Sequence, residues 1–141
     1  MAGEARRERV IGNQLSELAD VERWLADLVV EWGLSDQTAF ALDLVLNEAV
    51  TNVITHGYPD GRPDSITIAL TDAADALVLE IEDHARPFDP LTAPAMATGT
   101  DLAHATIGGR GIRLIKTYSD EQCYSYVSGA NRLKLVVRKG S

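Results

Sequence analysis

The sequence has only one cysteine, Cys123, among its 141 residues. A single thiol cannot form an internal disulfide, and there is no CxxC pair or Cys/His cluster that could hold a structural zinc ion. Long apolar runs are also missing, since none approaches the roughly 18 residues that a membrane helix needs, and no apolar stretch follows the charged opening MAGEARRER. We therefore expect a protein of the reducing cytoplasm, without a membrane segment.

Basic residues are outnumbered, with 13 lysines and arginines against 21 aspartates and glutamates and a net charge of −8. A chain of this charge repels a nucleic-acid backbone, so we expect no nucleic-acid partner. Repeats and low-complexity runs are absent, and hydrophobic residues make up 45% of the chain. This length and composition predict one soluble globular domain over residues 1–141.

Two helices are predicted in the first half of the chain. Apolar residues recur at helical spacing after Ser16, which we expect to cap the first helix, and Gly33 marks its end. A second helix is predicted over residues 36–56, with Ser35 at its start and Gly57 as its stop signal.

Five segments have the character of strands. They are a weakly patterned edge segment at 6–13, two alternating runs at 66–70 and 77–81, and two final runs near 122–128 and 132–138. The last two flank a predicted turn over Ser128, Gly129, Ala130 and Asn131. Strands in antiparallel pairs with helices between them predict an α+β fold, with one mixed, mainly antiparallel sheet and the helices packed on one face.

The predicted second helix carries an acid and an amide. The stretch LNEAVTNVITHGY, residues 46–58, has Glu48 and Asn52 one turn apart on its polar side. Side chains four positions apart point the same way, so a carboxylate and an amide oxygen can converge on one water or one hard cation. A solvated helix face has the same composition without any function, so the spacing permits a site but does not identify one.

Two further motifs follow the predicted middle strands. The first, LEIEDHARPFDP at 79–90, ends a strand at Asp83, where a carboxylate can accept from a ligand amine or simply favour a turn. The second, IGGRGIRLIK at 107–116, puts glycines before a short helix predicted over 110–118, and backbone N–H groups in such a turn can bind an anion. GxGxxG, GKS and GKT are absent, which excludes the usual dinucleotide and P-loop classes.

The order of these motifs resembles that in the ATP-binding domain of the GHKL (histidine-kinase-like) class. It consists of the ExxxN helix, the strand that ends in Asp83, the long loop and the GGRG turn. Within that class, DHARPFDP and the ending YSYVSGANRLKLVVRK look most like the stand-alone anti-sigma-factor serine/threonine kinases. The resemblance runs from about residue 10 to residue 138. It implies a two-layer α/β sandwich of the Bergerat type, with a lid loop over about 84–107.

The resemblance also implies roles for single residues. Glu48 matches the general base, Asn52 the residue whose side-chain oxygen binds Mg²⁺, and Asp83 the acid that accepts from the adenine amino group. His56 stands where several relatives carry a basic residue near the phosphates, although it could equally cap the helix end. The full set of expected cofactor-binding residues is Asn52, His56, Asp83, Ala85, Pro87, Gly108, Gly109, Arg110 and Gly111.

The activity implied is that of an ATP-dependent serine/threonine protein kinase, with ATP and Mg²⁺ as cofactors, which also acts as an anti-sigma factor. The acceptor would be a serine or threonine of an anti-anti-sigma (STAS-type) protein, the second partner a sigma factor, and a homodimer is expected. A different hypothesis is a non-catalytic nucleotide-binding module that sequesters a protein partner. A histidine-kinase fragment is a third interpretation, which the lack of a phospho-acceptor helix pair disfavours.

One residue departs from the family pattern, which usually has glycine two positions after the adenine-contacting aspartate. Here that residue is Ala85, whose methyl could crowd the base or forbid a positive φ angle. Arg86, Pro87, Phe88 and Asp89 restore agreement with the turn of the family, so we expect Ala85 to be tolerated.

Overall fold

The computed structural model describes residues 5–58, 60–91 and 114–139. Its elements are strand β1 (Ala5–Gly12), helices α1 (Leu18–Glu31) and α2 (Asp36–Gly57), and strands β2 (Ser65–Asp72), β3 (Ala76–Asp83), β4 (Glu121–Val127) and β5 (Ala130–Arg138). A 3₁₀ turn over Leu15–Glu17 precedes α1, and residues 114–118 form a short helix. None of the helices in this part of the chain is long and apolar enough to cross a membrane.

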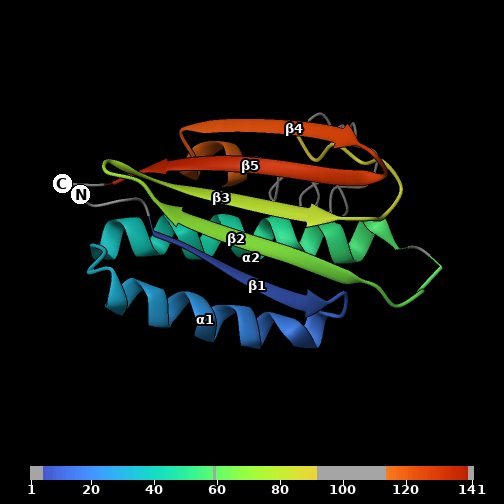
Figure 1. The fold of residues 1–141 in the computed structure, drawn as a ribbon, viewed down its shortest axis with the longest axis horizontal. Helices are drawn as coiled ribbons and strands as arrows, with labels where there is room; N and C mark the ends of the chain where they lie inside the picture. Colours follow the sequence, from blue (N-terminus) through green and yellow to red (C-terminus); the bar gives the residue numbers. More distant parts are fainter. Residues whose placement is uncertain (1–4, 59, 92–113, 140–141) are drawn as a thin grey trace, which may run out of the picture.

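The strands form one sheet in the order β1-β2-β3-β5-β4. Every pairing among these described strands is antiparallel, and β1 lies at one edge as predicted. In Figure 1, α2 runs along the sheet and α1 lies beside α2 and β1. The prediction of an α+β fold with a mainly antiparallel sheet is confirmed.

One face of the sheet is apolar because alternate residues of three strands point into the core. The residues of β2, β3 and β5 in the hydrophobic core are Ile66, Ile68, Leu70, Leu77, Leu79, Ile81, Leu133, Leu135 and Val137. The helices contribute Val21, Leu25, Leu28, Leu42, Val45, Leu46, Ala49 and Val50 to the same core. The intervening positions of the inner strands include the exposed Glu80, Arg132 and Lys134, so the opposite face is polar.

The helix ends follow the predicted signals in part. The Ser35 hydroxyl caps α2 by accepting from the Thr38 N–H at 3.2 Å. Gly33 has a φ of 61° just past α1, as a helix stop requires. The prediction that Ser16 caps the first helix is wrong, because Ser16 lies inside the 3₁₀ turn and α1 begins only at Leu18.

The final hairpin is tighter than predicted. Ser128 and Gly129 have φ angles of 55° and 79°, and positive φ at both positions is typical of a two-residue type I′ turn. Asn131 was expected in the turn but lies in β5, where its Cα is the register partner of Asp83. This register decides the geometry of the candidate site.

Gly57 ends α2 through a close contact, not through an unusual backbone angle. Its φ is not among the positive values of the described glycines, and a Cβ built on it would lie 2.9 Å from the Cβ of Ala85. Ala85 also has a negative φ, so its methyl causes no backbone strain of the kind considered above. A residue without a side chain at position 57 therefore lets the turn after β3 pack against α2.

Gly57→Ala is expected to lower the free energy of unfolding by about 1–3 kcal/mol, because the new methyl overlaps that of Ala85. Adding Ala85→Gly should restore most of this loss, since it removes the overlapping group. Urea denaturation of both variants measures the effect. Gly12→Ala is the control, because its Cβ would meet Glu17 at an ordinary 3.9 Å. A double variant no more stable than Gly57→Ala would mean that the contact with Ala85 is not the cause.

Candidate functional site

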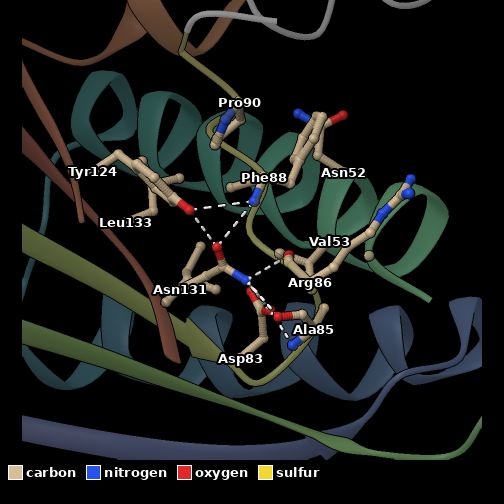
Figure 2. A pocket seen from close by; sticks show the side chains of 13 residues that line it. Asn52, Val53, Asp83, Ala85, Arg86, Phe88, Pro90, Tyr124, Asn131 and Leu133 are labelled. Carbon is tan, nitrogen blue, oxygen red and sulfur yellow. Dashed lines mark hydrogen bonds between the residues drawn. The ribbon is translucent and has the colours of Figure 1, made fainter. Parts of the chain in front are cut away.

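A cavity lies between the C-terminal half of α2, the end of β3 and the start of β5 (Figure 2). Its polar lining includes Asn52, Asp83, Arg86, Tyr124 and Asn131, and its apolar lining includes Ile81, Phe88, Pro90 and Leu133. The volume in which the centre of a water molecule can lie is about 20 Å³, so the cavity has room for about one ordered water. A larger ligand such as a purine base therefore enters only if part of the wall moves.

Asp83 is the buried acid of this cavity, with 4% of its surface exposed. Its Oδ1 accepts from the Ala85 N–H and from Asn131 Nδ2, both at 2.9 Å. None of the described residues donates to Oδ2, which leaves that oxygen for a ligand donor. Burial raises the pKa of the Asp83 carboxyl above its usual range, and the two donors oppose this in part.

Asn52 brings an unsatisfied amide to the same cavity. Its Nδ2 is buried and has no hydrogen-bond partner among the described residues. Such an atom costs about 1–3 kcal/mol, and a ligand can offset that cost. Rotation about χ2 puts the side-chain oxygen in the same place, where it suits a hard cation such as Mg²⁺. The residues present therefore fit a bound nucleotide and its metal.

Three other predicted residues lie outside the cavity lining. Glu48 is half-buried on α2, one turn before Asn52, and makes no hydrogen bond or ion pair with the described residues. The exposed His56 stacks its ring on Phe88, with centroids 5.3 Å apart and 24° between the planes. Pro87 is exposed. The structure thus brings together Asn52, Asp83 and Ala85, and leaves the other three around them.

The predicted phosphate-side residues Gly108, Gly109, Arg110 and Gly111 lie outside the described residues, so their roles stay predictions. The same holds for positions 92–107 of the predicted lid. The first part of that predicted segment, 84–91, is described, and Ala85, Arg86, Phe88 and Pro90 from it line the cavity.

Sequence reasoning missed Asn131, which is 5% exposed, lines the cavity and hydrogen-bonds to Asp83 and to the turn after β3. Its Nδ2 donates to Asp83 Oδ1 at 2.9 Å and to the carbonyl oxygens of Ala85 and Arg86 at 3.2 and 3.0 Å. Its Oδ1 accepts from the Phe88 N–H at 3.1 Å and from the Tyr124 hydroxyl. The signal that could have found it is the type I′ turn, which places Asn131 opposite Asp83.

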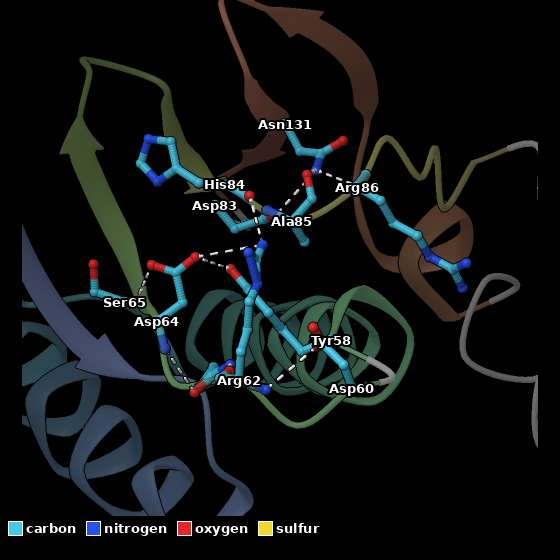
Figure 3. Close-up of polar contacts among 11 residues, drawn as sticks. Tyr58, Asp60, Arg62, Asp64, Ser65, Asp83, His84, Ala85, Arg86 and Asn131 are labelled. Carbon is cyan, nitrogen blue, oxygen red and sulfur yellow. Dashed lines mark hydrogen bonds and ion pairs between the residues drawn. The ribbon is translucent and has the colours of Figure 1, made fainter.

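A second polar network holds the chain just after Asp83 (Figure 3). Arg62 donates to the carbonyl oxygen of His84 at 3.0 Å, and its guanidinium lies 5.1 Å from the centre of the Tyr58 ring. The Tyr58 hydroxyl donates to Asp64 at 3.1 Å. Burial and this bond raise the pKa of Tyr58 to about 12, so the hydroxyl stays a donor at neutral pH. The end of α2 and the turn after β3 are thereby linked.

The family of the chain follows from its match to known domains. Residues 11–139 match the histidine kinase-like ATPase domain. The chain belongs to this family. It is 28% identical to the serine/threonine-protein kinase BtrW of Bordetella bronchiseptica over 116 residues, which are 82% of each protein. It is 26% identical to the serine-protein kinase RsbW of Listeria monocytogenes over 111 residues, 76% of this chain and 71% of RsbW.

Solved structures of low sequence identity share the fold of this histidine kinase-like domain. The RsbU and RsbW domains of a Mycobacterium tuberculosis protein superpose with a TM-score of 0.69 at 13% identity, over 97% of this chain and 33% of that one. This chain thus spans about a third of that protein. The SiaB–SiaC complex of Pseudomonas aeruginosa gives 0.68 at 16% identity, over 92% of this chain and 88% of the other. The predicted resemblance to the GHKL class is confirmed, and the extent of the domain over 1–141 stays a prediction.

Asp83→Asn is expected to raise the Tm of the ligand-free protein at pH 7. The amide oxygen of the new asparagine can accept both hydrogen bonds that Asp83 Oδ1 accepts, while the cost of burying a charge disappears. Because burial raises the pKa of Asp83, the wild-type carboxyl favours folding when protonated, and this contribution is lost as the pH rises through that pKa.

The difference in Tm between Asp83→Asn and wild type should therefore shrink as the pH falls towards 4. Thermal unfolding between pH 4 and pH 8 measures it, with Asp27→Asn on the exposed side of α1 as the control. A wild type more stable than Asp83→Asn at pH 7 would contradict the interpretation.

Proposed function

We propose that this chain is an ATP-dependent serine/threonine protein kinase and anti-sigma factor, which phosphorylates an anti-anti-sigma partner of the STAS type. The observation that carries the proposal is that the unsatisfied amide of Asn52 and the half-satisfied carboxylate of Asp83 line one cavity. The kinase names of BtrW and RsbW support the reaction type. A sigma factor as second partner, and a homodimer, belong to the same proposal.

The described residues divide the work of phosphoryl transfer between two ends of one site. Asp83 Oδ2 accepts from the amino group of the adenine base, and Asn52 would hold Mg²⁺, which neutralises phosphate charge when bound. The acceptor hydroxyl attacks the γ-phosphorus, its proton passes to Glu48, and ADP leaves with the electrons of the broken P–O bond. Glu48 has no ion pair within the described part of the chain, so its carboxylate is available for that proton.

Glu48→Gln should lower the phosphorylation of the STAS-type partner by about 10²–10⁴-fold, because the amide cannot accept the proton. Nucleotide affinity should change little, since Glu48 does not line the cavity. Transfer of label from γ-labelled ATP to the partner measures the rate. Glu22→Gln, an exposed glutamate on α1, is the matched control. Undiminished labelling by Glu48→Gln would remove Glu48 from the mechanism.

The non-catalytic nucleotide-binding module is the second candidate, and Ala85 favours it, because this residue lines the cavity at the position where the family usually has glycine. The two candidates differ in whether ATP is consumed in the presence of the partner. Intact ATP after long incubation with the STAS-type protein and Mg²⁺, together with clear nucleotide binding, would favour the module over the kinase.

Mg²⁺ and ATP at about 100 times the dissociation constant should stabilise the protein by about 2.7 kcal/mol. In Asn52→Ala the part of this shift that depends on Mg²⁺ should disappear, because the amide oxygen for the metal is gone. Thermal unfolding with and without Mg²⁺ measures both parts. The control is Asn47→Ala on the same helix. The Asn47 amide donates to the Asp43 carbonyl oxygen at 2.8 Å and is not part of the cavity lining. An unchanged Mg²⁺ response in Asn52→Ala would exclude Asn52 as a metal ligand.

A further inference from the structure

The side chain of Asn131 joins the end of β3, the turn after it and β4 through a single amide group. It bonds to Asp83, to the backbone of residues 85, 86 and 88, and to Tyr124. Figure 2 shows these bonds converging beside the cavity. We propose that Asn131 is the positioning residue that makes this site selective for a base with an exocyclic amino group, as in adenine. The inference rests on the proposed nucleotide-binding function.

Asn131 acts through its neighbours because its own hydrogen-bonding capacity is already used. The amide oxygen has two lone pairs and accepts from two donors, Phe88 N–H and the Tyr124 hydroxyl. The amide nitrogen has two hydrogens and three acceptors within 3.2 Å. With 5% of the residue exposed, no donor or acceptor remains for the base.

The consequence for Asp83 is a fixed orientation of its carboxylate. Asn131 and the Ala85 N–H both bind Oδ1, so Oδ2 is the oxygen left to meet a ligand. A fixed, acceptor-only oxygen pairs with the amino group of adenine and repels the carbonyl oxygen that hypoxanthine carries at the same position. Without Asn131 only the Ala85 N–H holds Oδ1, so the carboxylate rotates more easily and the penalty against a carbonyl oxygen falls.

The same amide fixes the backbone that faces the base. The carbonyl oxygens of Ala85 and Arg86 and the N–H of Phe88 are all held by Asn131. Three of the four wall residues from 85 to 88 are thus held by one side chain. A preorganised wall of this kind supports discrimination because a wrong base leaves buried polar groups unpaired.

The test compares the affinities of the protein for ATP and for inosine triphosphate (ITP), which has a carbonyl oxygen in place of the amino group. Isothermal titration of the whole chain measures both. Wild type should prefer ATP by at least about tenfold, and Asn131→Ala should lose about tenfold in ATP affinity while its ITP affinity stays the same. The control is Asn13→Ala, which removes two bonds to the backbone of residues 62 and 64 and should leave the ATP to ITP ratio unchanged.

Equal losses for ATP and ITP in Asn131→Ala, or no loss for either, would overturn the selectivity role. Tyr124→Phe provides a milder second variant, because it removes one donor to the Asn131 oxygen and one acceptor of the Phe88 N–H but leaves both bonds of Asp83 in place. It should lower the ATP to ITP ratio in the same direction but by less, and an unchanged ratio in this variant counts against the proposal. A wild-type protein that binds neither nucleotide would refute the proposed function itself. The wild-type titration alone separates this outcome from a failure of the selectivity role.

Discussion

The antiparallel pairing of β3 with β5 is the constraint on which the candidate site depends. It places Asn131 opposite Asp83, so that a carboxylate and an amide from strands far apart in the sequence share one hydrogen bond. The two-residue turn at Ser128 and Gly129 fixes where β5 begins. A shift of one residue would turn Asn131 to the polar face and leave Asp83 without its side-chain donor.

The cavity contains two features that a purely structural core would avoid. Asp83 is a buried acid whose pKa is raised by its surroundings, and Asn52 has a buried amide nitrogen with no partner in the described part of the chain. Each costs folding free energy, and the apolar core formed by the sheet and two helices offsets that cost. Polar groups kept at such a cost are typical of binding sites, where function and stability compete.

Local signals in the sequence predicted the helices and the strands, since helical spacing and the Ser35 cap are local properties. The order of the motifs, and the family resemblance based on it, predicted three cavity residues, Asn52, Asp83 and Ala85. Asn131 was missed because its role comes from a register between strands, which depends on the length of one turn. Gly57 was predicted as the stop signal of the second helix, and α2 does end there. Its close approach to Ala85, however, is a tertiary contact that no local sequence pattern contains.

The narrow cavity and the Asn131 network bear on how a base would enter. The wall residue Phe88 donates its backbone N–H to the Asn131 oxygen and stacks its ring on His56. Asp83, in contrast, accepts a hydrogen bond from the Asn131 nitrogen. The Asn131 nitrogen also holds the carbonyl oxygens of Ala85 and Arg86, so this amide fixes part of the wall as well as the carboxylate. Moving Phe88 breaks the bonds from its N–H to the Asn131 oxygen and to the Tyr124 hydroxyl, each of which is worth about 1 kcal/mol. The bond from the Asn131 nitrogen to Asp83 does not involve Phe88, so the carboxylate can stay aligned while Phe88 moves.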